Sequence, residues 1–326
     1  MVKKIQEHGG GIDAAARRFG GARRDWIDLS TGINPVAYPI GQLAQDAWTA
    51  LPDHAAQTAL LDAARDFWQV PEGAAILATP GASAPIAMIP RLRRAGRVHI
   101  AAPTYNEHAA AFSAAGWHVA DSTPDPHIPD TQIADAQVIV HPNNPDGRIF
   151  SAQDLNAPLR VVDESFCDVM PDASLIAQAG RTDTLILKSF GKFWGLAGLR
   201  LGFVIGAPAL IEELAQMLGP WPVSGPALTI GTAALNDLHW AHNTRQRLTD
   251  DAARLDAAMK QAGAKTVGGT SLFRLYDVPD AAIWQTRLAR HHVWSRTFSY
   301  NPRWLRLGLP APDAWGRIGS AIKAPE

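Results

Sequence analysis

The sequence predicts an α/β protein: a mostly parallel central β-sheet with helices on both faces, followed by a smaller α+β domain at the C-terminal end. Between residues 74 and 208, short apolar runs alternate with alanine-rich segments of helical spacing, the pattern of β-α-β units. From about residue 209 the order changes to long helical segments followed by short strands. The 326 residues suffice for one large core and a smaller partner domain.

The chain opens with an expected helix at 12–20 and an extended segment at 26–35, and helical spacing follows at 41–50 and 55–68. Residues 74–92 have the pattern of a strand, a glycine turn and a helix. The other strands of the main sheet are expected within 97–105, 117–122, 136–147, 160–166, 184–190 and 199–208, with a helix at 107–116. For the C-terminal part we expect helices at 209–236, 243–263 and 280–291 and strands within 271–278, 291–298 and 303–310.

These elements predict three parts: an N-terminal arm at 1–35 that packs with the small domain, a large domain at 36–210 and a small domain at 211–326. The 30 basic and 31 acidic residues nearly balance, so nothing indicates nucleic acid or a membrane surface as a partner. No secretion signal is recognisable at the start, and the single cysteine, Cys167, cannot build a disulfide framework or a cysteine zinc cluster. We expect a cytoplasmic protein with no metal site.

Polar residues follow the apolar runs at the points where parallel strands are expected to end. Ligands of open α/β sheets bind at the carboxyl ends of the strands, so these residues are candidates for one site. They are Gly81, Ala82, Ser83, Tyr105, Asn143, Asn144, Asp163 and the segment from Ser189 to Lys192. Strand ends are polar in any soluble sheet, so position alone does not identify a site. The chemistry of these side chains has to indicate which ligand they could bind.

That chemistry matches the parts of pyridoxal 5'-phosphate. A lysine such as Lys192 can form an imine with an aldehyde. Ser189, Arg200 and the turn Gly81-Ala82-Ser83 before a helix could hold a phosphate. Asp163 could pair with a protonated ring nitrogen.

The ring face and the phenolate oxygen also have candidate partners. Tyr105 could stack on the ring, and an asparagine amide in "HPNNPDG" (141–147) could face the phenolate. Each residue also has an ordinary interpretation: Lys192 as a surface lysine, Asp163 as a helix or turn cap, and "HPNNPDG" as a plain turn. Only the combination predicts the cofactor site.

Four segments resemble those of the class I/II aminotransferases, which are fold-type I pyridoxal-phosphate enzymes. "SFGKFWGLAGLRLG" (189–202) resembles the Ser-x-x-Lys segment with an arginine, Arg200, eight residues after the lysine. This resemblance implies that Lys192, and not Lys188, binds the cofactor covalently. "HPNNPDG" implies that Asn144 faces the phenolate, while "VVDESF" and "PTYNEH" imply that Asp163 pairs with the ring nitrogen and Tyr105 stacks on the ring.

A narrower resemblance is to the threonine-phosphate decarboxylases of cobalamin biosynthesis, close relatives of histidinol-phosphate aminotransferases. The segments that carry it are "EHGGGIDAAARRFG", "DLSTGINPVAYP", "PTYNEHAAAF" and "VWSRTFSYNPRWLRLGLP". It implies conversion of L-threonine O-3-phosphate, a phosphorylated amino acid, to (R)-1-amino-2-propanol O-2-phosphate and carbon dioxide by a homodimer. It also implies substrate contacts by His8, Gly32, Asn34, Arg296 and Arg306.

Two positions depart from the family pattern. Phe166 stands where tyrosine is frequent, which implies one phenolate hydrogen bond fewer. Leu51, in "LPDH", replaces a tyrosine whose hydroxyl would reach the phosphate in the neighbouring subunit. Among the other arginines, Arg303 and Arg306 lie three apart on an expected strand and therefore face opposite sides, and Arg274 and Arg287 are expected on the surface.

Three other functions remain as alternatives. An aminotransferase acting on histidinol phosphate or a similar amino acid would use the same cofactor site. A non-catalytic pyridoxal-phosphate-binding regulator would need a DNA-binding domain, for which the N-terminal arm is too short. A Rossmann-type nucleotide binder would carry G-x-G-x-x-G after its first strand, and that motif is missing.

Overall fold

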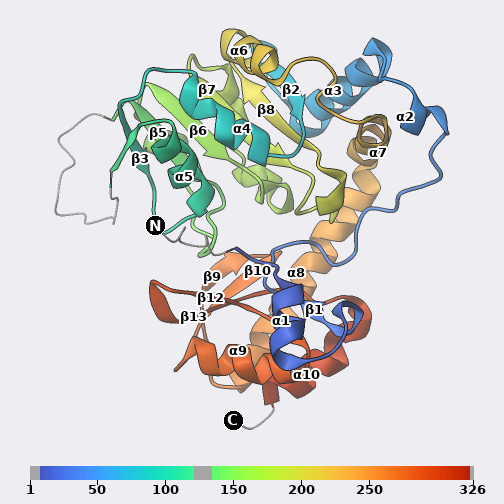
Figure 1. The fold of residues 1–326 in the computed structure, drawn as a ribbon, viewed down its shortest axis with the longest axis vertical. Helices are drawn as coiled ribbons and strands as arrows, with labels where there is room; N and C mark the ends of the chain where they lie inside the picture. Colours follow the sequence, from blue (N-terminus) through green and yellow to red (C-terminus); the bar gives the residue numbers. More distant parts are fainter. Residues whose placement is uncertain (1–7, 121–133, 324–326) are drawn as a thin grey trace. The chain divides into compact units, whose positions relative to one another are not determined.

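The computed structural model describes residues 8–120 and 134–323, which form two compact units (Figure 1). The large unit comprises Tyr38–Asn144 and Arg148–His242. The small unit comprises Met1–Ala37, Pro145–Gly147 and Asn243–Glu326. Within the described residues, no helix combines the length and the apolar character needed to cross a membrane.

The large unit is built on a seven-stranded sheet in the order β2-β8-β7-β6-β5-β3-β4. Its strands are β2 (Ala75–Thr79), β3 (Arg97–Ile100), β4 (His118–Ala120), β5 (Ala136–Val140), β6 (Leu159–Asp163), β7 (Thr184–Ser189) and β8 (Gly202–Gly206). Strand β8 runs antiparallel to β2 and β7, and all other pairs are parallel. The predicted mostly parallel sheet is confirmed.

Helices cover both faces of this sheet. One face carries Val161, Leu187 and Val204, which pack in one core cluster with residues of α4 (Ser83–Met88), α5 (Asn106–Ala114) and α6 (Pro208–Leu218). Figure 1 shows α4 and α5 in front of the strands. On the opposite face Phe203 meets Trp68 of α3 (His54–Trp68), with ring centroids 5.0 Å apart. Because both faces are covered, the strands carry consecutive apolar residues in their central parts, which explains the continuous apolar runs in the sequence.

The small unit contains a four-stranded antiparallel sheet in the order β12-β13-β10-β9 and the short parallel pair β1-β11. The strands are β1 (Ile27–Asp28), β9 (Lys265–Thr270), β10 (Phe273–Asp277), β11 (Val293–Trp294), β12 (Arg296–Phe298) and β13 (Asn301–Gly308). The helices α1 (Ile12–Phe19), α9 (Ala281–Arg290) and α10 (Trp315–Lys323) accompany them. Ile12 and Trp26 of the N-terminal segment share a core cluster with Ala289 of α9.

Several expected elements differ from those observed. Only α2 (Asp46–Thr49) forms within the helix expected at 41–50, because the residues around it are largely exposed and a short helix needs a buried face. Helix α7 (Gly225–Asn236) follows α6, and α8 (Leu238–Gln261) begins five residues before the expected start. Strand β9 and helix α10 were not expected. Strand β9 carries Gly268 and Gly269 and is exposed over its first half, so it lacks an alternating apolar pattern.

The arginines of the small unit bear out one expectation and correct another. On β13, Arg303 is exposed and Arg306 is buried, so the two do face opposite sides. Arg274 is only partly exposed: 19% of its side chain is accessible, and Nη2 lies 2.8 Å from Oδ2 of Asp256. Arg287 is also partly buried, with its guanidinium carbon 3.8 Å from the Trp284 ring centroid. Both arginines are less exposed than expected, because a neighbouring carboxylate or ring holds part of the side chain against the protein.

Candidate active site

A pocket lies in the large unit at the carboxyl ends of the parallel strands. It is lined by Ala82, Ser83, Ile86, Tyr105, Val140, Asn144, Asp163, Ser165, Phe166, Ser189, Gly191, Lys192, Ala197 and Arg200. The structure thus brings together all of the predicted cofactor residues except Gly81, whose backbone adjoins this group. Their individual roles remain predictions.

Gly81 and Arg200 are in direct contact at one end of the pocket. A Cβ atom at Gly81 would stand 2.6 Å from Nη2 of Arg200, so a larger residue would displace the guanidinium from its present position. Gly81 also has φ = 75°, a left-handed conformation that costs other residues energy. Arg200 donates from Nη1 to the carbonyl of Ala197 at 3.2 Å. The turn before α4 and the Arg200 guanidinium therefore form one cationic corner.

Asp163 is a buried anion at the end of β6. Nε2 of His108 lies 2.9 Å from its Oδ2, and the backbone N–H and hydroxyl of Ser165 donate to its Oδ1 at 2.9 and 2.5 Å. Burial alone would raise the pKa of the Asp163 carboxyl, but the contacts with His108 and Ser165 outweigh it and hold that pKa below its ordinary value. Asp163 is therefore ionised at neutral pH although it is 2% exposed.

Tyr105 precedes α5 and shares the pocket with Asp163. Its burial, followed by the nearby charges of Glu107 and Asp163, raises the pKa of the phenol to about 12. The ring stands at 84° to the His108 imidazole, with centroids 6.1 Å apart. Tyr105 is thus a neutral, partly buried ring beside the carboxylate.

The two consecutive asparagines have separate functions. Asn143 is fully buried, accepts a hydrogen bond from the Thr104 hydroxyl at 2.6 Å and donates to the Pro103 carbonyl at 2.9 Å. These bonds hold the turn to the neighbouring segment. Asn144 is the one that lines the pocket, and its contact with the phenolate stays a prediction.

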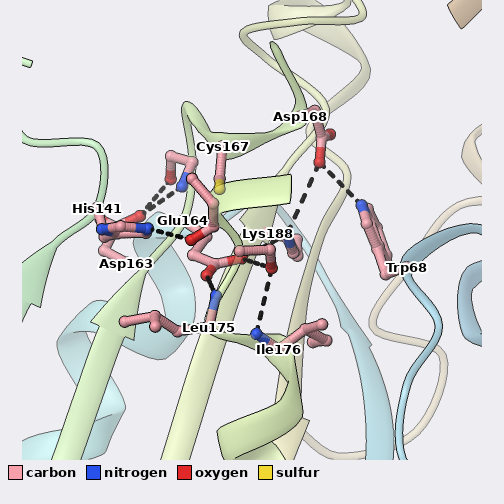
Figure 2. Close-up of polar contacts among 12 residues, drawn as sticks. Trp68, His141, Asp163, Glu164, Cys167, Asp168, Leu175, Ile176 and Lys188 are labelled. Carbon is pink, nitrogen blue, oxygen red and sulfur yellow. Dashed lines mark hydrogen bonds and ion pairs between the residues drawn. The ribbon is translucent and has the colours of Figure 1, made fainter. Parts of the chain in front are cut away.

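Lys188 and Lys192, which lie four residues apart, have different surroundings. Lys188 lies within β7, is 2% exposed and places Nζ 2.6 Å from Oε2 of Glu164 (Figure 2). Burial opposes its charge, but Glu164 and then Asp168 raise the pKa of Lys188 above its ordinary value, so it remains a cation. Lys192 lies in the loop after β7, lines the pocket and has Nζ 5.4 Å from the Phe166 ring centroid.

Strand alternation explains this separation. Asp163 pairs with Leu187 across β6 and β7, so Asp163 and Ser189 share one face of the sheet. Glu164 and Lys188 point to the other face, away from the pocket, where they meet each other. Lys188 is therefore a structural residue of the core.

Sequence reasoning missed three residues of this region: His108, Ser165 and Asp168. His108 comes one helical turn after Tyr105, and Ser165 comes two residues after Asp163, where a hydroxyl and an N–H can reach back to a carboxylate. These spacings were the available signals. Asp168 carries no such signal, because its partners are distant in the sequence.

A group of metal-ligating side chain types is present in the core but is already hydrogen-bonded. Ligand-type atoms of His141, Glu164 and Cys167 come within 4.8 Å of one another (Figure 2). The N–H of Phe150 donates to Nδ1 of His141 at 3.0 Å, so Nε2 carries the proton and donates to the Ala173 carbonyl at 2.7 Å. Both carboxylate oxygens of Glu164 also accept hydrogen bonds. The hydrogen bonds of His141 and Glu164 to the described residues around them therefore make this group part of the hydrogen-bonded core.

The predicted substrate residues all belong to the small unit. Arg296 and Arg306 are cross-strand partners on β12 and β13. Burial, and then the charge of Arg296, lowers the pKa of Arg306 to about 10, and its Nη2 donates to the Ser30 carbonyl at 2.5 Å. Asn34 is buried, and its Oδ1 accepts from Nη2 of Arg247 at 2.7 Å. Gly32 is buried and His8 is exposed. Their contact with substrate remains a prediction.

Comparison with known proteins gives close full-length relatives. A protein of a Sinorhizobium species named threonine-phosphate decarboxylase is 41% identical over 332 residues, covering 97% of each chain. A Pseudomonas aeruginosa protein of the same name is 39% identical over 326 residues, again covering 97% of each chain.

Solved structures show the same fold. L-threonine-O-3-phosphate decarboxylase from Porphyromonas gingivalis has a TM-score of 0.75 at 20% identity, covering 90% of this chain and 98% of that one. Histidinol-phosphate aminotransferase from Sinorhizobium meliloti, solved in complex with pyridoxal-5'-phosphate, has a TM-score of 0.79 at 16% identity, covering 99% of this chain and 96% of that one. The model of the family described as aminotransferase class I and II matches residues 24–314. The chain therefore belongs to the class I and II aminotransferase family.

Proposed function

We propose that the protein is a pyridoxal-phosphate-dependent decarboxylase that converts L-threonine O-3-phosphate to (R)-1-amino-2-propanol O-2-phosphate and carbon dioxide, a step of cobalamin biosynthesis. The observation that carries the chemistry is the pocket in which Lys192, Asp163 and Arg200 come together. The names of the two full-length relatives support the substrate.

The residues of the pocket fit the cofactor. Asp163 is a buried carboxylate kept ionised by its hydrogen bonds, which suits a protonated ring nitrogen. Arg200 and the backbone next to Gly81 form a cationic corner that suits a phosphate. Lys192 supplies a primary amine for the aldehyde, and Asn144 supplies an amide. Each functional group of the cofactor thus has a partner of matching chemistry.

The mechanism assigns separate tasks to the residues of the chain. Bound pyridoxal phosphate supplies an electron sink for the carbon bond that breaks. Asp163 holds a proton on the ring nitrogen, because a buried anion there stabilises the protonated form. With that sink in place carbon dioxide would leave Cα of the substrate, and Nζ of Lys192, which lines the same pocket, would supply the proton that replaces it. Phe166 has no hydroxyl, so the phenolate oxygen depends on Asn144.

Arg306 and Arg296 would hold the anionic groups of the substrate. Two guanidinium groups on adjacent strands attract a carboxylate or a phosphate, and Arg306 is preorganised by its bond to the Ser30 carbonyl. His8, Gly32 and Asn34 would close over the substrate. How these arginines orient the carboxylate would decide between loss of carbon dioxide, which gives decarboxylation, and loss of the Cα proton, which gives transamination.

Transamination of histidinol phosphate or a similar amino acid is the second candidate. The structural likeness to a histidinol-phosphate aminotransferase supports it, since both reactions need the same cofactor pocket. An aminotransferase requires a 2-oxo acid as amino acceptor, whereas a decarboxylase does not.

The two candidates are separated by one incubation. Purified protein with pyridoxal phosphate and L-threonine O-3-phosphate should release carbon dioxide and aminopropanol phosphate without any 2-oxo acid. Lys192→Ala is the control and should abolish the release. Turnover that occurs only after 2-oxoglutarate is added, with a stoichiometric keto product, would replace the decarboxylase by the aminotransferase.

We further propose that the protein is a cytoplasmic homodimer. Trp48 and Leu51, close together in the large unit, are 66% and 65% exposed, which supports a buried contact with a second copy. Leu51 offers that copy an apolar side chain in place of a hydroxyl. Light scattering on the purified protein should give twice the mass of one chain, which is 35.0 kDa. An active monomer would show that catalysis does not require a dimer.

A further inference from the structure

Aromatic side chains packed in the core hold the segment that carries Lys192 in place. Its neighbours Phe190, Phe193 and Trp194 are all fully buried. The Trp194 ring stacks between Phe190 and Trp240, with centroid distances of 5.0 and 5.3 Å and interplanar angles of 13° and 12°. Lys192 is therefore an accessible amine on a segment whose flanking side chains are all in the core.

One hydrogen bond sets the orientation of that stack. The indole N–H of Trp68 donates to Oδ1 of Asp168 at 2.8 Å (Figure 2). The indole N–H of Trp194 donates to Oδ2 of the same carboxylate at 3.2 Å. Asp168 is 4% exposed, so water does not compete for these bonds. Stacking alone leaves a ring free to slide, whereas a directed N–H bond fixes its rotation.

The charge of Asp168 is accommodated by a nearby cation. Nζ of Lys188 lies 3.8 Å from Oδ1 of Asp168 and 2.6 Å from Oε2 of Glu164. An indole N–H can only donate, and an ionised carboxylate can only accept, so Asp168 matches both tryptophans at once. An asparagine would turn an amide N–H₂ group toward one of the two indoles.

We propose that Asp168 is a positioning residue for Lys192, acting through the indole of Trp194. The inference rests on the proposed function, in which Lys192 Nζ is the amine that receives the cofactor. Asp168 links the Lys192 segment to the buried ion pair between Lys188 and Glu164. The residues next to that pair in the sequence, Asp163 and Ser189, line the pocket. The carboxylate thereby fixes the amine relative to the partners of the ring nitrogen and the phosphate.

The structure offers a matched pair of variants. Trp194→Phe and Trp68→Phe each keep a ring and each remove one hydrogen bond to Asp168. Only Trp194 belongs to the Lys192 segment. A merely structural role of Asp168 would make the two variants behave alike, because both loosen the same carboxylate.

The readout is the covalent capture of pyridoxal phosphate by Lys192. Cofactor is removed from the full-length holoenzyme and added back, samples are reduced with borohydride at successive times, and the labelled peptide is quantified by mass spectrometry. Thermal unfolding is recorded in parallel. Trp194→Phe should slow capture roughly ten- to a hundredfold, because a displacement of about 1 Å of a reacting group has effects of that size. Trp68→Phe should remain within about twofold of wild type while losing similar thermal stability.

Asp168→Asn provides the second test, since it weakens the same hydrogen bond by changing its acceptor instead of its donor, Trp194. It should slow capture as much as Trp194→Phe does, and the double variant should be no slower than either single one. Equal capture rates for Trp194→Phe and Trp68→Phe, or additive effects in the double variant, would overturn the positioning role. A wild-type enzyme that carries no label on Lys192 would instead refute the proposed function.

Discussion

Replacing His108 by phenylalanine would keep an aromatic ring of similar size but remove the contact between Nε2 and Asp163. In the wild type, burial raises the pKa of Asp163, and the His108 contact is the largest of the effects that lower it again. Without that contact only the two hydrogen bonds from Ser165 oppose the burial effect, so the pKa of Asp163 should rise above its wild-type value. A charged hydrogen bond of this kind contributes about 1.5–3 kcal/mol, which corresponds to roughly a ten- to hundredfold loss of cofactor affinity.

The sign of the pH dependence follows from these pKa values. The wild-type carboxyl has a folded pKa below its unfolded one, so its contribution to stability is present above about pH 4 and is lost as the pH falls through the folded value. In His108→Phe the carboxyl protonates at higher pH, and the anion that faces the ring nitrogen is lost under milder acidification.

The assay is the dissociation constant of pyridoxal phosphate, measured by absorbance between pH 5 and 8 for the wild type, His108→Phe and His108→Gln. Affinity should fall with acidification in His108→Phe, whereas the glutamine amide can still donate to Asp163 and should restore part of it. Equal affinities and equal pH profiles for the wild type and His108→Phe would refute the role given to this contact.

Three other variants test separate parts of the site. Arg306→Lys should raise KM for threonine phosphate by about tenfold, while Arg303→Lys, on the exposed side of the same strand, should leave it within about twofold. Lys188→Met should lower the free energy of unfolding by about 3–5 kcal/mol in denaturant titrations, because it leaves a buried carboxylate without its cation; an unchanged midpoint would contradict the ion pair. Gly81→Ala should weaken cofactor binding, since its Cβ would stand 2.6 Å from Nη2 of Arg200, and wild-type affinity would show that the guanidinium is not held there.

The main sheet could be predicted because its strands are buried on both faces. Strand β7, for example, carries three consecutive apolar residues at 185–187, and such runs stand out without any alignment. Strand β9 could not be found in this way, since it is largely exposed and contains Gly268 and Gly269. The helix expected at 41–50 failed for the opposite reason: its composition is helical, but most of the segment has no core to pack on.

Two features of the sequence predicted residues of the candidate site: their position at the ends of expected strands and their spacing within the family motifs. Lys192, Asp163 and Asn144 follow buried strands, and the resemblance chose Lys192 over Lys188. The physical reason for that choice is visible only in three dimensions, because strand alternation turns Lys188 into the core to meet Glu164. The partners of a buried carboxylate depend on which elements pack around it, so the role of Asp168, whose indole partners are distant in the sequence, had to come from the structure.

The attachment point of the cofactor tests the central claim most directly. Holoenzyme reduced with borohydride, digested and mapped by mass spectrometry should carry pyridoxyl phosphate on the peptide that contains Lys192, with Lys188 unmodified. Label on Lys188, or no label on either lysine in a protein that decarboxylates threonine phosphate, would contradict the account.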